Sequence, residues 1–166
     1  NPELNRDLLL AGCLFHDCGK LWENCYPKED FTMPYSEAGE LLGHIPLGIE
    51  LVNNLWKRIM ALPEAESWKT LDPASPDVRM HLLHLIASHH GELAFGSPVF
   101  TKTPEAVALH YIDNLDAKLE MFRGAYETSE ALAPKVLQRK APLPANVVLP
   151  LPSVLPLERD GADAMQ

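Results

Sequence analysis

Apolar residues recur every three or four positions along most of this chain, which is the spacing of amphipathic helices. A first helix is expected to open with Asn1-Pro2-Glu3, because Asn caps helices, Pro suits the first helical position and an acid suits the first turn. Its apolar positions are Leu4, Leu8, Ala11 and Phe15. The helix is therefore predicted to run to about His16 or Asp17, before Gly19 breaks it.

Proline-containing loops separate three further predicted helices. The first of these helices starts near Ser36 or around His44-Ile45-Pro46 and ends before Pro63. The second starts at a cap at Asp77 and runs toward His89-His90-Gly91. The third runs from Thr103-Pro104-Glu105 to about Tyr126. The apolar positions expected to face inward on the last helix are Val107, Tyr111, Leu115, Leu119 and Phe122. The pattern predicts an all-α helical bundle.

The C-terminal part of the chain has a different composition. A short helix is predicted over Ser129–Arg139, and the one strand-like stretch, Val147–Leu149, looks too isolated to pair. From Ala141 onward the chain is rich in proline, which cannot continue a helix or a sheet ladder. We therefore expect a helical domain over 1–140 and an extended or disordered tail over 141–166, which could pack on a second subunit in a homo-oligomer.

Composition and charge narrow the class of protein. The 166 residues are 46% hydrophobic and 22% charged, which fits a globular protein, and no run reaches the ~18 apolar residues of a membrane span. The first residues do not resemble a signal peptide. The chain has an odd number of cysteines, Cys13, Cys18 and Cys25, so we expect reduced thiols, with Cys13 in the core, in a cytoplasmic protein. The net charge of −9 argues against unaided binding of nucleic acid.

His16-Asp17 is the strongest chemical feature. The pair ends the most apolar predicted helix, so both side chains should lie near the core, and a buried carboxylate needs a partner or a cation. Imidazole and carboxylate suit Mn, Fe, Zn or Ni. Lys20 follows on the next turn and can place a positive charge on a phosphate oxygen.

Other residues at helix ends can converge on this pair. His44 begins one predicted helix, His89 and His90 end another, and Asp113 lies within the longest one. Helical bundles commonly build metal sites from such positions. Four alternatives remain open. They are a hydrogen bond between His16 and Asp17 without a metal, a surface position for His44, a pair between Asp113 and a basic residue such as Lys118, and a helix dipole that alone favours His89 or His90 at a C-terminus. His81, His84 and His110 are expected to be structural.

The run HDCGK at residues 16–20 resembles the HDxGK motif of the HD-domain metal-dependent phosphohydrolases. The GH at 43–44, the HHG at 89–91 and Asp113 fit the wider ligand pattern of that superfamily. Residues 88–120 are more narrowly similar to the YhaM-type 3′→5′ exoribonucleases. The resemblance covers roughly residues 4–125.

The resemblance implies two divalent transition-metal ions, Mn first, with Fe, Ni, Zn or Mg as alternatives. It makes His16, Asp17, His44, His89 and Asp113 ligands, with His90 an alternative ligand or a substrate-binding residue. Asp17 would bridge the two ions, and Lys20 would orient the scissile phosphate as a catalytic and substrate-binding residue.

The implied activity is phosphodiester hydrolysis on single-stranded RNA, which a separate OB-type domain would deliver. The alternative activity is that of a phosphohydrolase acting on small nucleotides. The family pattern begins with another His about a helix and a half before His16, and residues 1–15 contain none. We therefore expect the chain to be part of a longer polypeptide. The remaining alternative is a binding domain impaired by the loss of that ligand.

Overall fold

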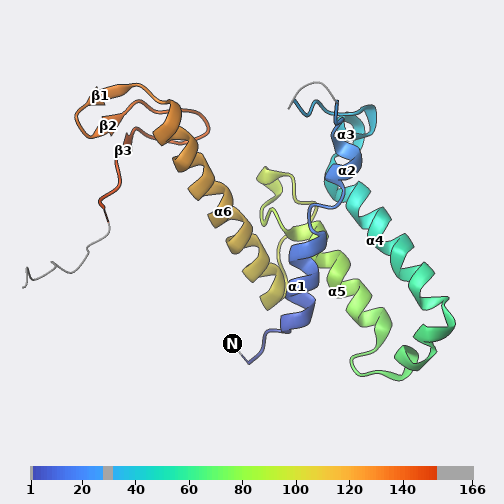
Figure 1. Cartoon of the computed structure of the whole chain (residues 1–166). Coiled ribbons are helices and arrows are strands. Elements are labelled where there is room, and N and C mark those ends of the chain that lie inside the picture. The colour runs from blue at the N-terminus through green and yellow to red at the C-terminus, as the bar shows by residue number, and fades with distance from the viewer. Residues whose placement is uncertain (1, 28–31, 153–166) are drawn as a thin grey trace, which may run out of the picture. The chain divides into compact units, whose positions relative to one another are not determined.

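The structure, a computed structural model, describes residues 2–27 and 32–152 and divides into two units, Asn1–Asp116 and Ala117–Gln166. The helices, shown in Figure 1, are α1 Arg6–Phe15, α2 Lys20–Glu23, α3 Glu37–Leu42, α4 His44–Met60, α5 Ser75–Ser88 and α6 Pro104–Thr128, with 3₁₀ helices η1 Pro63–Thr70 and η2 Leu93–Phe95. The predicted all-α helical fold is confirmed, with one small sheet added. No described helix is long and apolar enough to cross a membrane.

Polar caps set the helix starts. The Asn5 side chain accepts a hydrogen bond from the Leu8 N–H at 3.0 Å, so α1 begins at Arg6 and the predicted start at Asn1 is wrong. Ser36 caps α3 in the same way. The predicted cap at Asp77 is also wrong, because α5 begins two residues earlier, where Pro76 occupies its first turn.

The core of the first unit joins α1, α4, α5 and the start of α6. Leu85 and Ile86 of α5 are fully buried, and Leu109 of α6 is 1% exposed. Each such side chain contributes about 1.5–3 kcal/mol relative to exposure in water. This packing fixes the ends of α1 and α5 beside the start of α4 (Figure 1).

Helix α6 buries a different set of residues from the predicted one. Ala106 and Leu109 make its contacts with the core of the first unit, and Ala125 packs in the second unit. The residues expected to face inward are exposed: Val107 by 41%, Tyr111 by 66%, Leu115 by 60%, Leu119 by 60% and Phe122 by 39%. The helix carries apolar residues on several faces, so apolar spacing alone does not identify the buried face. The small side chain of Ala106 allows close packing there. Cys13, expected in the core, is exposed, and all three cysteines are free thiols.

The second unit contains strands where a helix was predicted. Strand β1 (Ala131–Ala133) pairs antiparallel with β2 (Val136–Leu137), and β2 pairs with β3 (Val147–Val148). Pro134 explains the error over 129–139, because proline lacks an N–H and disfavours helix at the residue before it.

The proline-rich segment takes part in this unit as far as β3. Val147, judged too isolated to pair, is 2% exposed and packs with Leu137, Leu143 and Ala125. The prediction that the Val147–Leu149 stretch is too isolated to pair is therefore wrong. The remainder of the predicted tail, 153–166, lies outside the described residues.

Candidate metal centre

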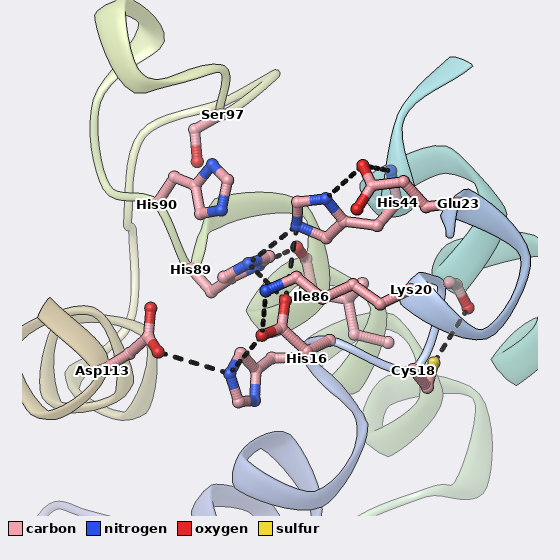
Figure 2. Close-up of polar contacts among 12 residues, drawn as sticks. His16, Cys18, Lys20, Glu23, His44, Ile86, His89, His90, Ser97 and Asp113 are labelled. Carbon is pink, nitrogen blue, oxygen red and sulfur yellow. Dashed lines mark hydrogen bonds and ion pairs between the residues drawn. The ribbon is translucent and has the colours of Figure 1, made fainter. Parts of the chain in front are cut away.

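The predicted ligands come together from the ends of three helices and one position within a fourth. His16 is the C-cap of α1, with Asp17 directly after it, and His89 is the C-cap of α5, with His90 directly after it. His44 is the first residue of α4, and Asp113 lies within α6. Figure 2 shows the side chains of His16, His44, His89, His90 and Asp113 gathered around one centre.

Gly19 allows the turn after α1 to lie directly against the start of α4. A Cβ built on it would lie 1.9 Å from the His44 carbonyl oxygen and 2.7 Å from the Gly48 nitrogen. Only a residue without a side chain lets the turn after Asp17 contact the start of α4 at this distance. The glycine of the HDCGK run therefore has a packing role in setting the site's geometry.

Asp17 lies at the middle of the cluster. Its Oδ1 is 3.4 Å from the His44 Nε2 and 3.6 Å from the His89 Nε2, and its Oδ2 is 3.5 Å from the His16 Nε2. On the other side of His16, the same Nε2 is 3.5 Å from Asp113 Oδ1. One oxygen of this carboxylate thus faces two imidazole rings, and the other oxygen faces a third.

Each of the four rings has its Nδ1 beside an oxygen that can only accept a hydrogen bond. The acceptors are Cys13 O for His16 at 2.9 Å, Glu23 Oε1 for His44 at 2.9 Å, Ile86 O for His89 at 2.8 Å and Phe95 O for His90 at 2.7 Å. The proton of each neutral ring must therefore be on Nδ1, which leaves the Nε2 lone pair free. Metal-ligating histidines have this arrangement.

The free lone pairs point to a cation. The Nε2 atoms of His44 and His89 are 3.4 Å apart, and neither carries a proton in the neutral form. Among the described residues, the buried Asp17 Oδ1 also lacks a hydrogen-bond donor. A cation resolves this concentration of acceptors, so the donor set fits a divalent metal. One ligand atom from each of His44, His89 and His90 also lies within 4.8 Å of the others.

Charge around Asp17 keeps it ionised. Burial raises the pKa of its carboxyl, but the neighbouring His89 ring and the hydrogen bond and positive charge of Lys20 outweigh burial, so that the pKa lies well below its usual range. Lys20 Nζ is 2.7 Å from Asp17 Oδ2. Burial and the neighbouring His89 lower the pKa of His90, which favours its neutral, ligating form.

The structure thus places all six predicted ligands together, and their binding of metal stays a prediction. Asp113 Oδ1 lies 3.5 Å from His16 Nε2, whereas the sequence suggested Lys118 as a partner for Asp113. His110, expected to be structural, has its Nδ1 2.9 Å from the His89 carbonyl oxygen and supports the backbone of a predicted ligand. Sequence reasoning missed Glu23, because nothing in the run KLWE indicates that its last side chain is buried.

Comparison with known proteins agrees with this geometry. The family model described as the HD domain matches residues 1–118. The chain belongs to the HD domain family. The match ends close to the boundary of the first unit, so this HD domain corresponds to the unit that holds the metal centre.

Curated relatives extend the comparison. This HD domain chain is 41% identical over 126 residues to the "3'-5' exoribonuclease YhaM" of Bacillus subtilis. The aligned residues cover 76% of this chain and 35% of the relative. The protein of the same name from Bacillus licheniformis is 42% identical, and that from a Geobacillus species is 38% identical, over equal shares of this chain. The chain therefore spans about a third of these relatives' length. No solved structure matches.

Proposed function

We propose that this chain carries the catalytic centre of a metal-dependent phosphohydrolase that removes nucleotides from the 3′ end of single-stranded RNA. Membership of the HD domain family and the similarity to proteins named as 3′→5′ exoribonucleases support this activity. The observation that carries it is the set of imidazole Nε2 atoms 3.4–3.6 Å from the two oxygens of Asp17.

Two metal positions are proposed on either side of Asp17. His16 and Asp113 would hold one ion, and His44 and His89 the other, with Asp17 contributing to both. Manganese is the first candidate, since a mixed imidazole and carboxylate set suits it. When bound, the divalent ions supply Lewis-acid activation of water and neutralise phosphate charge.

Lys20 is the proposed contact to the scissile phosphate. Its side chain is 46% exposed, and its ammonium group pairs with Asp17 Oδ2. From this position it can donate a further hydrogen bond to a phosphate oxygen and hold the phosphodiester beside Asp17.

His90 is better suited to hold metal than phosphate. Its Nδ1 donates to Phe95 O, so the Nε2 of the neutral ring has no proton to give to a phosphate oxygen. The lowered pKa of His90 favours that neutral ring. We therefore keep His90 as an additional ligand of the His44–His89 position.

The substrate proposal draws on the exposure of the centre. The side chains of Asp17 and Asp113 are 34% and 36% exposed, whereas His89 is 1% exposed. The centre is thus open on the side of the carboxylates, which suits the end of a polymer. Because the chain carries a net charge of −9, we propose that a separate OB-type domain of a longer protein delivers the RNA.

The test measures hydrolysis by the 166-residue chain with Mn²⁺. The substrates are the p-nitrophenyl ester of thymidine 5′-monophosphate, which needs no RNA-binding domain, and a single-stranded RNA labelled at its 5′ end. We expect the chain alone to hydrolyse the ester, and we expect progressive shortening of the RNA once the proposed OB-type domain is joined to the chain. Asp17→Asn should abolish both activities, whereas Asp116→Asn, a change of an exposed carboxylate three residues beyond Asp113, should leave them unchanged.

Two results would replace the proposal. Hydrolysis of nucleoside phosphates with no cleavage of the ester or of RNA would identify a nucleotide phosphohydrolase. Wild-type protein that binds no divalent transition metal would identify an impaired binding domain. The three free thiols support a cytoplasmic location as part of the proposal, and sedimentation of the chain tests the predicted homo-oligomer.

A further inference from the structure

We propose that Glu23 is a positioning residue of the metal centre, whose single carboxylate oxygen fixes both the tautomer of His44 and the start of helix α4. The role in metal affinity rests on the proposed metal binding. The hydrogen bonds that support it belong to the chain alone and can be tested without metal.

One oxygen of Glu23 serves two donors of the same residue. Glu23 Oε1 lies 2.8 Å from the backbone nitrogen of His44 and 2.9 Å from its Nδ1. Glu23 is 6% exposed, although it comes from a different helix, 21 residues earlier in the chain. Because a buried carboxylate is costly without strong hydrogen bonds, this placement indicates a specific function for its charge.

The backbone holds Glu23 in place from the opposite side. Its carbonyl oxygen accepts a hydrogen bond from the Ser36 N–H at 2.8 Å. A Cβ on Gly39 would lie 2.2 Å from that carbonyl oxygen, so the first turn of α3 contacts the Glu23 backbone directly. The carboxylate is thereby fixed relative to His44 and has little freedom to turn away.

Helix α4 has no cap of its own. Its N-cap is Gly43, which has no side chain, and its first turn contains no acidic residue. The N-terminal N–H groups of a helix carry a partial positive charge, and here they lie next to a proposed cation site. Glu23 supplies the missing acceptor from outside the helix and offsets that positive charge.

The same carboxylate distinguishes His44 from the other rings. His16, His89 and His90 donate from Nδ1 to backbone carbonyl oxygens, whereas His44 donates to a charged oxygen. A carboxylate that accepts a hydrogen bond from Nδ1 orients the ring and strengthens metal binding by Nε2. The Nε2 of His44 should therefore be the strongest nitrogen donor of the four, and it is directed at Asp17 Oδ1, 3.4 Å away.

The experiment compares three variants of the 166-residue chain by Mn²⁺ titration calorimetry and by ¹⁵N NMR of the His44 ring. Glu23→Gln keeps an acceptor oxygen and removes the charge. Glu23→Leu removes both. Glu40→Gln is the control, because Glu40 is an exposed acid on the neighbouring helix α3.

We expect about 10-fold weaker Mn²⁺ binding for Glu23→Gln and about 100-fold weaker binding for Glu23→Leu. The control should bind as the wild type does. In metal-free protein, Glu23→Gln should retain the Nδ1–H tautomer of His44, and Glu23→Leu should give a mixture of tautomers. A merely structural role would lower the melting temperature without this change in tautomer.

Wild-type affinity in a folded Glu23→Leu protein would overturn the inference, as would an unchanged tautomer. If Glu23→Leu does not fold, Glu23→Gln decides: unchanged Mn²⁺ affinity contradicts the positioning role. Failure of the proposed function looks different. In that case the wild type itself binds no Mn²⁺, while the tautomer of His44 still changes in Glu23→Leu.

Discussion

Replacing Gly19 with alanine is a direct test of how the metal centre is assembled. The backbone of Gly19 has φ −64° and ψ −21°, which alanine adopts without strain. The added methyl group, however, would lie 1.9 Å from the His44 carbonyl oxygen, where ordinary contact begins near 3.4 Å. The obstacle is backbone, which no side-chain rotation can relieve.

The magnitude follows from that overlap. The turn after Asp17 and the start of α4 would have to separate by about 1.5 Å, which is the difference between 3.4 and 1.9 Å. Overpacking of a fixed contact costs about 3 kcal/mol, and in a domain of this size it lowers the melting temperature by about 10 °C. The separation also moves Asp17 away from His44, so Mn²⁺ binding should weaken at least ~10-fold, since a shift of about 1 Å disrupts a site of this kind.

Thermal unfolding followed by circular dichroism, together with Mn²⁺ titration, measures both effects. Gly124→Ala is the matched control, because a Cβ at this position in α6 meets nothing within 4 Å. It should stabilise the protein by about 0.5–1 kcal/mol, since alanine favours a helix over glycine. If Gly19→Ala leaves both the melting temperature and the metal affinity unchanged, the reasoning about close backbone contact is wrong.

Four further results are expected from the proposed metal site, the half-buried His84, the loop beside His90 and the second unit. Removing Mn²⁺ with a chelator should lower the melting temperature, because ligand at 100 times its Kd contributes about 2.7 kcal/mol; an unchanged temperature would contradict metal binding by the folded state. Burial and nearby positive charge lower the pKa of His84, whose Nε2 accepts from the Lys102 N–H at 3.0 Å. The folded state then binds fewer protons than the unfolded one, so stability should fall as the pH falls through the ordinary value of about 6.5, and His84→Gln should reduce that slope in unfolding curves. Phe95 is 60% exposed, and its carbonyl oxygen is 2.7 Å from His90 Nδ1, so in the longer protein with its RNA-binding domain Phe95→Ala should weaken RNA binding by about 1–3 kcal/mol of base stacking in filter-binding assays, with Mn²⁺ affinity unchanged. Val147→Ala should cost about 1 kcal/mol or more of unfolding free energy without affecting Mn²⁺ binding, and an unchanged stability would mean that this strand is not packed.

Periodicity and residue type predicted the helices and the centre, because both depend on features within reach in the sequence. His16-Asp17 was placed correctly at the end of an apolar helix, and α4 begins at one of the two predicted starts, around His44-Ile45-Pro46, whereas the other, Ser36, caps α3. Apolar spacing also gave the region of α6, but not which residues of α6 pack inward. Several faces of that helix are apolar, so the face that packs against the core of the first unit is known only from the contacts of Ala106 and Leu109.

Features that depend on distant contacts were missed. Glu23 and His44 are 21 residues apart, with helix α3 between them, and no local pattern indicates that the Glu23 carboxylate is buried. The strands of the second unit have a different cause, since Pro134 was a local signal against the predicted helix and was given too little weight.

The imidazole hydrogen bonds join the fold to the chemistry. His16 and His89 are the C-caps of α1 and α5, and each places its Nδ1 on the carbonyl oxygen three residues earlier. Such carbonyls have no partner within the helix, so one hydrogen bond both satisfies the helix end and leaves Nε2 free for a metal. The two C-termini also bring partial negative charge to the centre, which favours a cation there. Helix α4 is the exception, because it brings its positive N-terminus, and Glu23 offsets that charge at the ring it orients.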